Sequence, residues 1–246
     1  MALISPDSAP RLTTLTLFGL RKGTVRWGLA QMGTAKPKLD RVPGLLFHKL
    51  LGSGQGKSFS LQPNFGRYGL LCTWDTEAAA DAFLEQSELM DAYRQHSDEM
   101  WTVKLLPYQS HGQWDAQEPF APTLTERYNL GPVAVLTRAS VNWQRLPAFC
   151  RFGLRTSKSL EAAEGLYCSI GLGELPFIRQ ATFSVWESVE AMKRFAYQNP
   201  QHQEVMRRTR AENWYSEELF ARFKPIASAG TWNGKDPLAG ALQTIS

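Results

Sequence analysis

The feature that most constrains this chain is an internal repeat. The segment WDTEAAADAF begins at Trp74 and the similar segment WESVEAMKRF begins at Trp186, an offset of 186 − 74 = 112 residues. Phe83 and Phe195 keep the same offset. Similarity at a fixed spacing indicates two copies of one structural unit. The sequence therefore predicts that the chain is built from two equivalent halves.

Later aromatic residues extend the repeat with small insertions. Trp101 and Trp214 match when one residue is inserted. Further on, WDAQEP from Trp114 resembles WNGKDP from Trp232 after a few more insertions. Both halves are therefore expected to end in a similar segment.

These matches set the predicted boundaries. The halves span residues 12–115 and 132–235, and residues 116–131 form a linker between them. The linker region, DAQEPFAPTLTERYNLG, carries two prolines, which is typical of a segment that connects two folded units.

Each half shows the same order of predicted elements: strand, helix, strand, strand, helix, strand. In the first half the strands are 14–22, 44–52, 66–74 and 100–108, and the helices are 25–35 and 78–96, the second broken near Ser87. In the second half the strands are 133–141, 165–173, 179–186 and 218–226, and the helices are 146–154 and 189–211.

The order βαββαβ is that of a ferredoxin-like unit. One such unit covers one face of its sheet with helices and leaves the other apolar face bare, and two fused copies can bury these faces against each other. We therefore expect an α+β fold in which two fused ferredoxin-like halves form a dimeric α/β barrel. Its interior, or the space between sheet and helices, is the natural place for an apolar ligand.

One glycine-rich segment superficially resembles a phosphate-binding loop. A P-loop requires G-x-x-x-x-G-K-[ST] between a strand and a helix. In LLGSGQGKS (Leu50–Ser58), the position five before Gly56 is Leu51, and a strand follows instead of a helix. The segment is interpreted as a connection between two strands, and nucleotide binding is not favoured.

Composition narrows the class of protein. The net charge is only +4, and no run of five basic residues occurs, so nucleic-acid binding is not favoured. The three cysteines have no paired spacing, which argues against a disulfide framework or a zinc site. The first residues do not resemble a signal peptide, and no apolar stretch approaches the ~20 residues of a membrane span. A cytoplasmic location is predicted, with peripheral membrane contact left open.

His202 is the histidine best suited to bind a cofactor. Asn199 is a good N-cap and Pro200 suits the first helical position, so His202 falls in the first turn of a helix. Its counterpart at the 112-residue offset is Met90. A neutral imidazole that projects from a helix into an apolar pocket suits an axial ligand of haem iron; a histidine of the core stays the alternative. Structural or solvent-exposed roles are expected for the other three histidines, His48, His96 and His111.

Other reactive side chains have simpler interpretations. Glu217 and Glu218 could serve as general acid and base, or they could lie at a solvated edge with local salt bridges, one of them to Arg222. Cys168 is expected to be a small core residue rather than a nucleophile.

Several segments resemble a known family. These are GLLFHKLLGSGQG, AVLTRASV and QATFSVWESVEAMKRFAY, followed by HQEVMRRTRAENWYSEELFARF. They resemble the spheroidene monooxygenase family, haem-containing oxygenases of carotenoid biosynthesis. The resemblance runs from about Leu15 to Phe223 and is strongest from Arg207 onward.

The resemblance implies an oxidoreductase that introduces hydroxy and then keto oxygen into an acyclic carotenoid. It implies haem, O₂ and electrons from a redox partner of ferredoxin type. The haem would be of b type, since no C-x-x-C-H attachment motif is present. The substrate of this chain and its oligomeric state stay open.

The resemblance also implies roles for individual residues. By analogy with haem enzymes on related barrels, His202 would be the proximal ligand of the iron. Arg138 would polarise bound oxygen or hold a propionate, Lys49 and Arg207 would bind propionates, and Phe195 and Trp214 would pack on the haem ring.

Two alternatives remain at this stage. One is a barrel without a cofactor that binds a lipophilic ligand. The other is a haem enzyme of dehydratase or peroxidase type on the same barrel, which needs no electron donor.

Overall fold

The structure is a computed structural model. It describes residues 11–56, 62–122, 131–147, 149–150, 160, 162–175, 178–198 and 200–242. In this part, the side chains of Leu175, Gln198, Pro200, Gln201, His202, Val205, Met206 and Arg210 lie outside the description.

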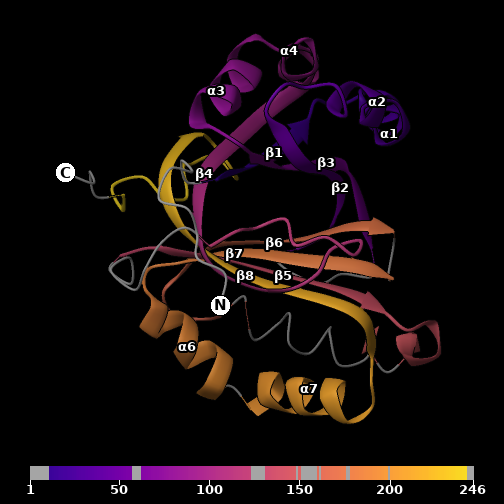
Figure 1. Ribbon diagram of the computed structural model, residues 1–246, viewed down its shortest axis with the longest axis vertical. Helices are drawn as coiled ribbons and strands as arrows, with labels where there is room; N and C mark the ends of the chain where they lie inside the picture. Colours follow the sequence, from indigo (N-terminus) through magenta and orange to yellow (C-terminus); the bar gives the residue numbers. More distant parts are fainter. Residues whose placement is uncertain are drawn as a thin grey trace.

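Eight strands of the described chain close into one antiparallel barrel (Figure 1). The strands are β1 (Leu12–Leu20), β2 (Leu45–Gly54), β3 (Pro63–Trp74), β4 (Ser97–Gly112), β5 (Val133–Val141), β6 (Leu166–Leu175), β7 (Arg179–Trp186) and β8 (Tyr215–Gly230). Their order around the barrel is β1-β3-β2-β6-β7-β5-β8-β4. The predicted α+β class and the barrel are thus confirmed.

Helices cover two opposite sides of the barrel (Figure 1). On one side lie α1 (Val25–Thr34), α2 (Lys36–Leu39), α3 (Glu77–Gln86) and α4 (Glu88–His96); on the other lie α6 (Val189–Gln198) and α7 (Pro200–Ala211), and a short 3₁₀ turn, η2 (Trp143–Arg145), follows β5. The predicted break at Ser87 is confirmed, because its side chain accepts a hydrogen bond from the Met90 amide and caps α4. The helix predicted at 146–154 falls largely outside the described residues.

The two sets of four strands pair in the same register. Leu12 at the start of β1 lies opposite Trp74, and Val133 at the start of β5 lies opposite Trp186. β1 and β5 are therefore offset by 133 − 12 = 121 residues. The last strands, β4 and β8, are both 16 residues long and end at Gly112 and Gly230, an offset of 230 − 112 = 118.

This register corrects one match made in the sequence. Trp101 was matched to Trp214 with one inserted residue, but Trp101 lies inside β4 and Trp214 precedes β8. The offset grows from 112 at the start of the last helix to 118 at the last strand, so six residues are added between them. Three lengthen α7 relative to α4, and three, Glu212–Trp214, follow it.

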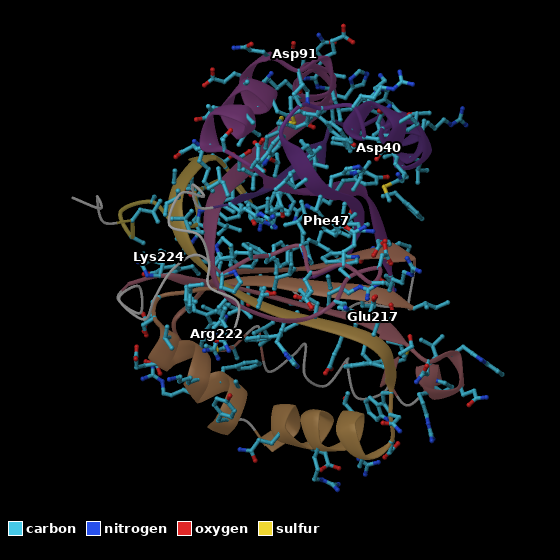
Figure 2. The ribbon with its side chains drawn as sticks, in the orientation of Figure 1. Asp40, Phe47, Asp91, Glu217, Arg222 and Lys224 are labelled. Carbon is cyan, nitrogen blue, oxygen red and sulfur yellow. The ribbon has the colours of Figure 1, made fainter. Side chains whose placement is uncertain are left out.

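The interior of the barrel is filled by apolar side chains from all eight strands. Trp114 and Phe120, which follow β4, enter it at one end, and Trp232 and Leu238, which follow β8, enter it at the other. Figure 2 shows Phe47 among these side chains. Of the two places expected for an apolar ligand, the interior is thus lined by packed side chains, and the other is the space between sheet and helices.

The glycine-rich segment connects β2 to β3, as predicted. The two strands pair antiparallel up to Gly54 and Pro63, and the Gln55 amide donates to the Gln62 carbonyl at 2.9 Å. Residues 57–61 lie outside the description. Among the described helices, none is both long and apolar enough to cross a membrane.

Candidate functional site

Within the described residues, the sheet face beneath α6 and α7 is exposed at its centre. Thr137 lies in the middle of β5, which is paired on both sides, yet it is exposed while the other eight residues of the strand are buried. The equivalent residue of the first half, Thr16 (137 − 121), is 1% exposed and shares a 2.9 Å hydrogen bond with Thr102. A side chain at the centre of a sheet stays exposed only where nothing packs over it.

The opening arises because small side chains replace large ones. In the first half, Phe18 lies opposite Tyr68 and stacks on Tyr93 of α4 with ring centroids 3.9 Å apart. In the second half the same register places Ala139 opposite Gln180. Next to this pair, Thr137 lies opposite Thr182 where the first half has Thr16 opposite the buried Leu70. We call this surface the open face: Thr137 is exposed at its centre, and its neighbours Ala139 (9% exposed) and Thr182 have small side chains.

Apolar side chains border the open face toward α6. Val135 and Trp186 are buried there with Met192. The ring of Phe195 packs on Trp186 at 5.3 Å, and Phe220 of β8, which lies opposite Thr137, joins the same cluster. A flat apolar molecule bound here would contact apolar side chains on both of its sides.

The same border holds two polar groups without partners. The Nε of Arg222 and the hydroxyl of Tyr108 are buried, and within the described residues neither has a hydrogen-bond partner. The Arg222 guanidinium lies 5.2 Å from the ring centre of Phe220. Burial raises the pKa of Tyr108, against the opposing effect of Arg222. Figure 2 shows Arg222 on the side of the sheet that faces α6. Buried donors of this kind usually have an acceptor, so they mark a place for a carboxylate or another acceptor.

Helix α7 places His202 over this side of the barrel. His202 is the third residue of α7, as Met90 is the third residue of α4. Met90 is 1% exposed and packs against the sheet of the first half. The His202 side chain itself lies outside the described part of the structure, as do Asn199 and the side chains of Val205 and Met206.

Inside the barrel, the other face of β5 presents a different site. Arg138, 3% exposed, forms an ion pair with Glu217 of β8. Its Nη2 lies 3.7 Å from Asp115 and 3.8 Å from Glu174. Lys49 of β2 pairs with Asp115 and lies 3.3 Å from Glu174. We call these residues, with Arg179 at 3.1 Å from Asp115, the interior charge cluster.

The interior charge cluster is balanced, with three cations and three carboxylates. Burial alone would raise the pKa of Glu217, but the amides of Ala116 and Asp115 and the Arg138 guanidinium outweigh it, so its pKa is lowered. The pKa of Asp115 is lowered in the same way, mainly by Lys49. The Nε1 of Trp114 donates to Glu174 at 2.7 Å and ties the cluster to the barrel core. The cluster therefore covers one end of the packed interior with charged and polar groups.

The predicted site residues thus separate into groups on two faces of the sheet. Arg138 and Lys49 meet inside the barrel, and Phe195 lies on the side of α6. Trp214 is buried near Val141 on the helix side, in a cluster separate from that of Phe195, where its Nε1 donates to Glu212 at 2.9 Å.

Arg207 lies apart from both groups. Its side chain is 67% exposed and makes two 2.9 Å hydrogen bonds to Glu204. The two arginines bonded to Glu204, Arg207 and Arg208, lower the pKa of that carboxyl to about 2.

Two other sequence expectations can be compared with the structure. Glu217 faces the barrel interior, where it pairs with Arg138, and Glu218 is exposed. Arg222 lies on the opposite face of β8, so it does not form the expected salt bridge with Glu217. Burial raises the pKa of Cys168 to about 12, which leaves the thiol neutral and fits a core residue. Among the described residues, no three His, Cys, Asp or Glu side chains gather as ligands of a metal ion.

Matching the two halves of the sequence did not reveal the open face, and it did not identify three of the six residues of the interior charge cluster. The 112-residue offset does not align β1 with β5, so the change from Phe18 to Ala139 was not visible; an offset of 121 would have shown it. Asp115, Glu174 and Arg179 carry no local motif. Only the pairing of strands brings them together.

Comparisons with known proteins were made by sequence and by structure. Three relatives are named spheroidene monooxygenase. The one from Rubrivivax gelatinosus is 38% identical over 239 residues, covering 94% of this chain and 91% of the relative. The one from Rhodobacter capsulatus is 35% identical over 233 residues, covering 94% and 97%. The one from Cereibacter sphaeroides is 35% identical over 231 residues, covering 93% and 71%.

A family model described as a domain of unknown function, DUF3291, matches residues 160–222. Among solved structures, an aldoxime dehydratase superposes with a TM-score of 0.62 at 9% identity, covering 99% of this chain and 91% of that one. Another, in complex with butyraldoxime, gives 0.61 at 11%, covering 98% and 88%. At these identities the likeness concerns the fold alone.

Proposed function

This chain belongs to the spheroidene monooxygenase family, and from that membership we propose that it is a haem-dependent monooxygenase. Its reaction would introduce hydroxy and keto oxygen into an acyclic carotenoid or a similar long apolar substrate. The observation that supports this most is the open face: one of two matched sheet faces has lost its large side chains beneath the helix that carries His202.

The open face fits haem in shape and in polarity. A planar macrocycle needs apolar walls and, for its propionates, buried donors. Val135, Phe195 and Phe220 would supply the walls. Arg222 and Tyr108 hold buried donors without described partners beside them. Bound there as haem b, the group would supply a redox-active iron for oxygen activation.

We propose that His202 is the axial ligand. The support is its position, since the equivalent Met90 is buried against the sheet of the first half. We propose that the imidazole takes the place in α7 that the Met90 side chain takes in α4. The surrounding apolar side chains would keep water from the reacting carbon, which protects reactive species from hydrolysis.

The propionate roles require reassignment. Arg138 and Lys49 are held by carboxylates on the far side of β5, and Arg207 is bonded to Glu204 at the surface. We therefore propose that Arg222 takes the propionate role, and that Arg138 and Lys49 hold the end of the barrel together. Phe195 keeps its proposed role in packing on the ring. Trp214 would anchor the end of α7, since its carbonyl accepts from the Asn142 amide at 2.8 Å.

We further infer that the barrel consists of two fused ferredoxin-like halves, at residues 12–115 and 132–235, with 116–131 between them. The matched registers and the repeated order of elements support this. For the complete reaction we propose O₂ and a ferredoxin-type donor. A cytoplasmic protein at the periphery of a membrane would meet such an apolar substrate.

An absorption spectrum of protein expressed with a haem precursor tests the proposal. We expect a Soret band in the parent that is lost or shifted in His202→Ala and unchanged in His111→Ala, a matched control in an exposed part of β4. Turnover of spheroidene that depends on a ferredoxin system would then separate an oxygenase from a dehydratase or peroxidase. A colourless parent that binds no added haem would rule out the proposed function.

A further inference from the structure

The barrel is closed by two seams of very different length. At one seam β4 pairs with β8 from Trp101 to Gly112. At the other, the described residues of β2 and β6 share only two pairs, Gly52 with Gly173 and Ser53 with Leu172. The strands therefore separate beyond a short contact at the β2–β6 seam.

A groove of about 270 Å³ lies at this short seam. Apolar residues from both halves form its walls: Leu29, Met32, Pro63, Phe65, Tyr68 and Leu172. Leu29 and Phe65 are 46% and 52% exposed. Large apolar side chains gathered in an exposed groove indicate a binding site for an apolar partner or ligand.

The groove reaches the strand next to the open face. Strand pairing forms one row across the barrel, from Ala139 to Gln180, Gly173, Gly52 and Tyr68. Gln180 lies opposite Ala139 and also lines the groove. The two glycines present no side chain, so the floor between Gln180 and Tyr68 is flat. With neighbouring strands about 4.8 Å apart, this row spans roughly 19 Å.

The lining favours a neutral occupant. Glu174 is the charged residue among the described lining residues, and its carboxylate is already engaged by Lys49 and Trp114. The other polar lining side chains, Ser53, Asn64 and Gln180, are uncharged. Apolar walls and a floor without side chains at Gly52 and Gly173 fit a narrow hydrocarbon chain better than a compact or ionic ligand.

We propose that the groove at the β2–β6 seam binds the distal part of a linear polyene whose reacting carbon lies over the open face. The proposal rests on the proposed function and adds the direction in which the substrate extends: from β5, across β7 and β6, to β2. Spheroidene, an acyclic C40 carotenoid, is the probe that tests it.

Gly52→Phe is the decisive variant. A Cβ at Gly52 would meet only the Gly173 carbonyl, at 3.8 Å, so the backbone admits a side chain here, and we expect the ring to occupy the groove. We expect spheroidene binding, measured from its absorption shift in detergent, to weaken at least tenfold. Binding of farnesol, a C15 isoprenoid too short to reach the groove, and the haem spectrum should not change.

A second pair of variants tests the groove independently of Gly52→Phe. Leu29→Ala removes a wall and should weaken spheroidene binding several-fold. Leu46→Ala removes a leucine of nearly equal exposure, 48%, outside the groove and should leave it unchanged.

Parental affinity for spheroidene in both Gly52→Phe and Leu29→Ala would overturn the proposal. A parent that binds haem and oxidises spheroidene while these variants do the same would leave the proposed function intact. A parent that binds neither haem nor spheroidene would remove both.

Discussion

At position 139 an alanine occupies the place that Phe18 fills in the first half of the barrel. Phe18 reaches the ring of Tyr93 on α4, whereas Ala139 presents only a methyl group at the matched position. Phe18 is fully buried against Tyr93, so the same backbone accommodates a phenylalanine without strain.

Restoring the ring should therefore close the site. We expect Ala139→Phe to fold like the parent and to lose haem affinity by more than tenfold in a Soret titration. Ala229→Phe, an equal substitution at an exposed position of β8, is the control. Haem binding of parental strength in a folded Ala139→Phe would place the cofactor elsewhere.

Glu217 makes stability depend on pH. Its folded-state pKa is lowered, so its contribution is complete above the unfolded value of about 4.5 and is lost as pH falls through the folded value. Glu217→Gln should lower the free energy of unfolding by about 1–3 kcal/mol near pH 7. The difference from the parent should shrink below about pH 4.5 in urea titrations.

Glu218→Gln provides the control for this experiment, because Glu218 is the exposed neighbour of Glu217. It should change the free energy of unfolding by less than about 0.5 kcal/mol. A difference between parent and Glu217→Gln that stays constant from pH 7 to pH 3 would contradict the assigned role of the charge cluster.

At the scale of elements, the two longest strands end in the same way. Gly112 and Gly230 have φ of 88° and 86°, and a Cβ at either would lie 2.1 Å from a carbonyl oxygen of the paired strand. Both positions thus require glycine for conformation and for space. The turn that follows each carries the matched tryptophan, Trp114 or Trp232, into the barrel.

Alanine at either glycine should destabilise the protein. We expect Gly112→Ala and Gly230→Ala each to lower the free energy of unfolding by about 1–3 kcal/mol. Gly33→Ala, in α1 with nothing within 4 Å, should instead raise it by about 0.4–1 kcal/mol. Equal urea midpoints for the three variants would show that the two turns tolerate other conformations.

Elements were predictable from sequence where a residue type had one structural meaning. Trp74 and Trp186 each end a strand and precede a capped helix, so their match aligned two equivalent junctions of strand and helix. Trp101 and Trp214 are both fully buried but for different reasons, inside the barrel and beside α7. Identity of side chain alone could not distinguish these environments.

The faces of the strands were harder to predict. Nearly every residue of β5 is buried on one side or the other, so alternation of apolar and polar residues could not tell the interior from the helix side. Arg138 was consequently expected to act on a bound haem, whereas its side chain lies inside the barrel and pairs with Glu217. Only the register of β5 with β8 and β7 reveals its partners.

At the scale of the whole molecule, one core serves both halves. Leu17 of the first half and Phe183 of the second are buried in the same interior cluster. Neither half could keep its inner sheet face covered without the other, so the barrel should unfold as a unit.

Phe183→Ala tests this unity. Its loss of packing should reduce the free energy of unfolding by about 3–5 kcal/mol. Tryptophan fluorescence and far-ultraviolet circular dichroism should report one coincident transition in both proteins, shifted together in the variant. Two separate transitions, with only one shifted, would mean that the halves unfold independently.

The unequal seams also bear on the time that a stiff molecule needs to enter and leave. A rod about 20 Å long passes slowly through a closed tunnel, because it must thread in end first. Along a groove open to solvent it can settle sideways, and the pairs at Gly52 and Ser53 that form the floor stay in place. Loading would then require no opening of the barrel, whose long β4–β8 seam stays paired through every cycle.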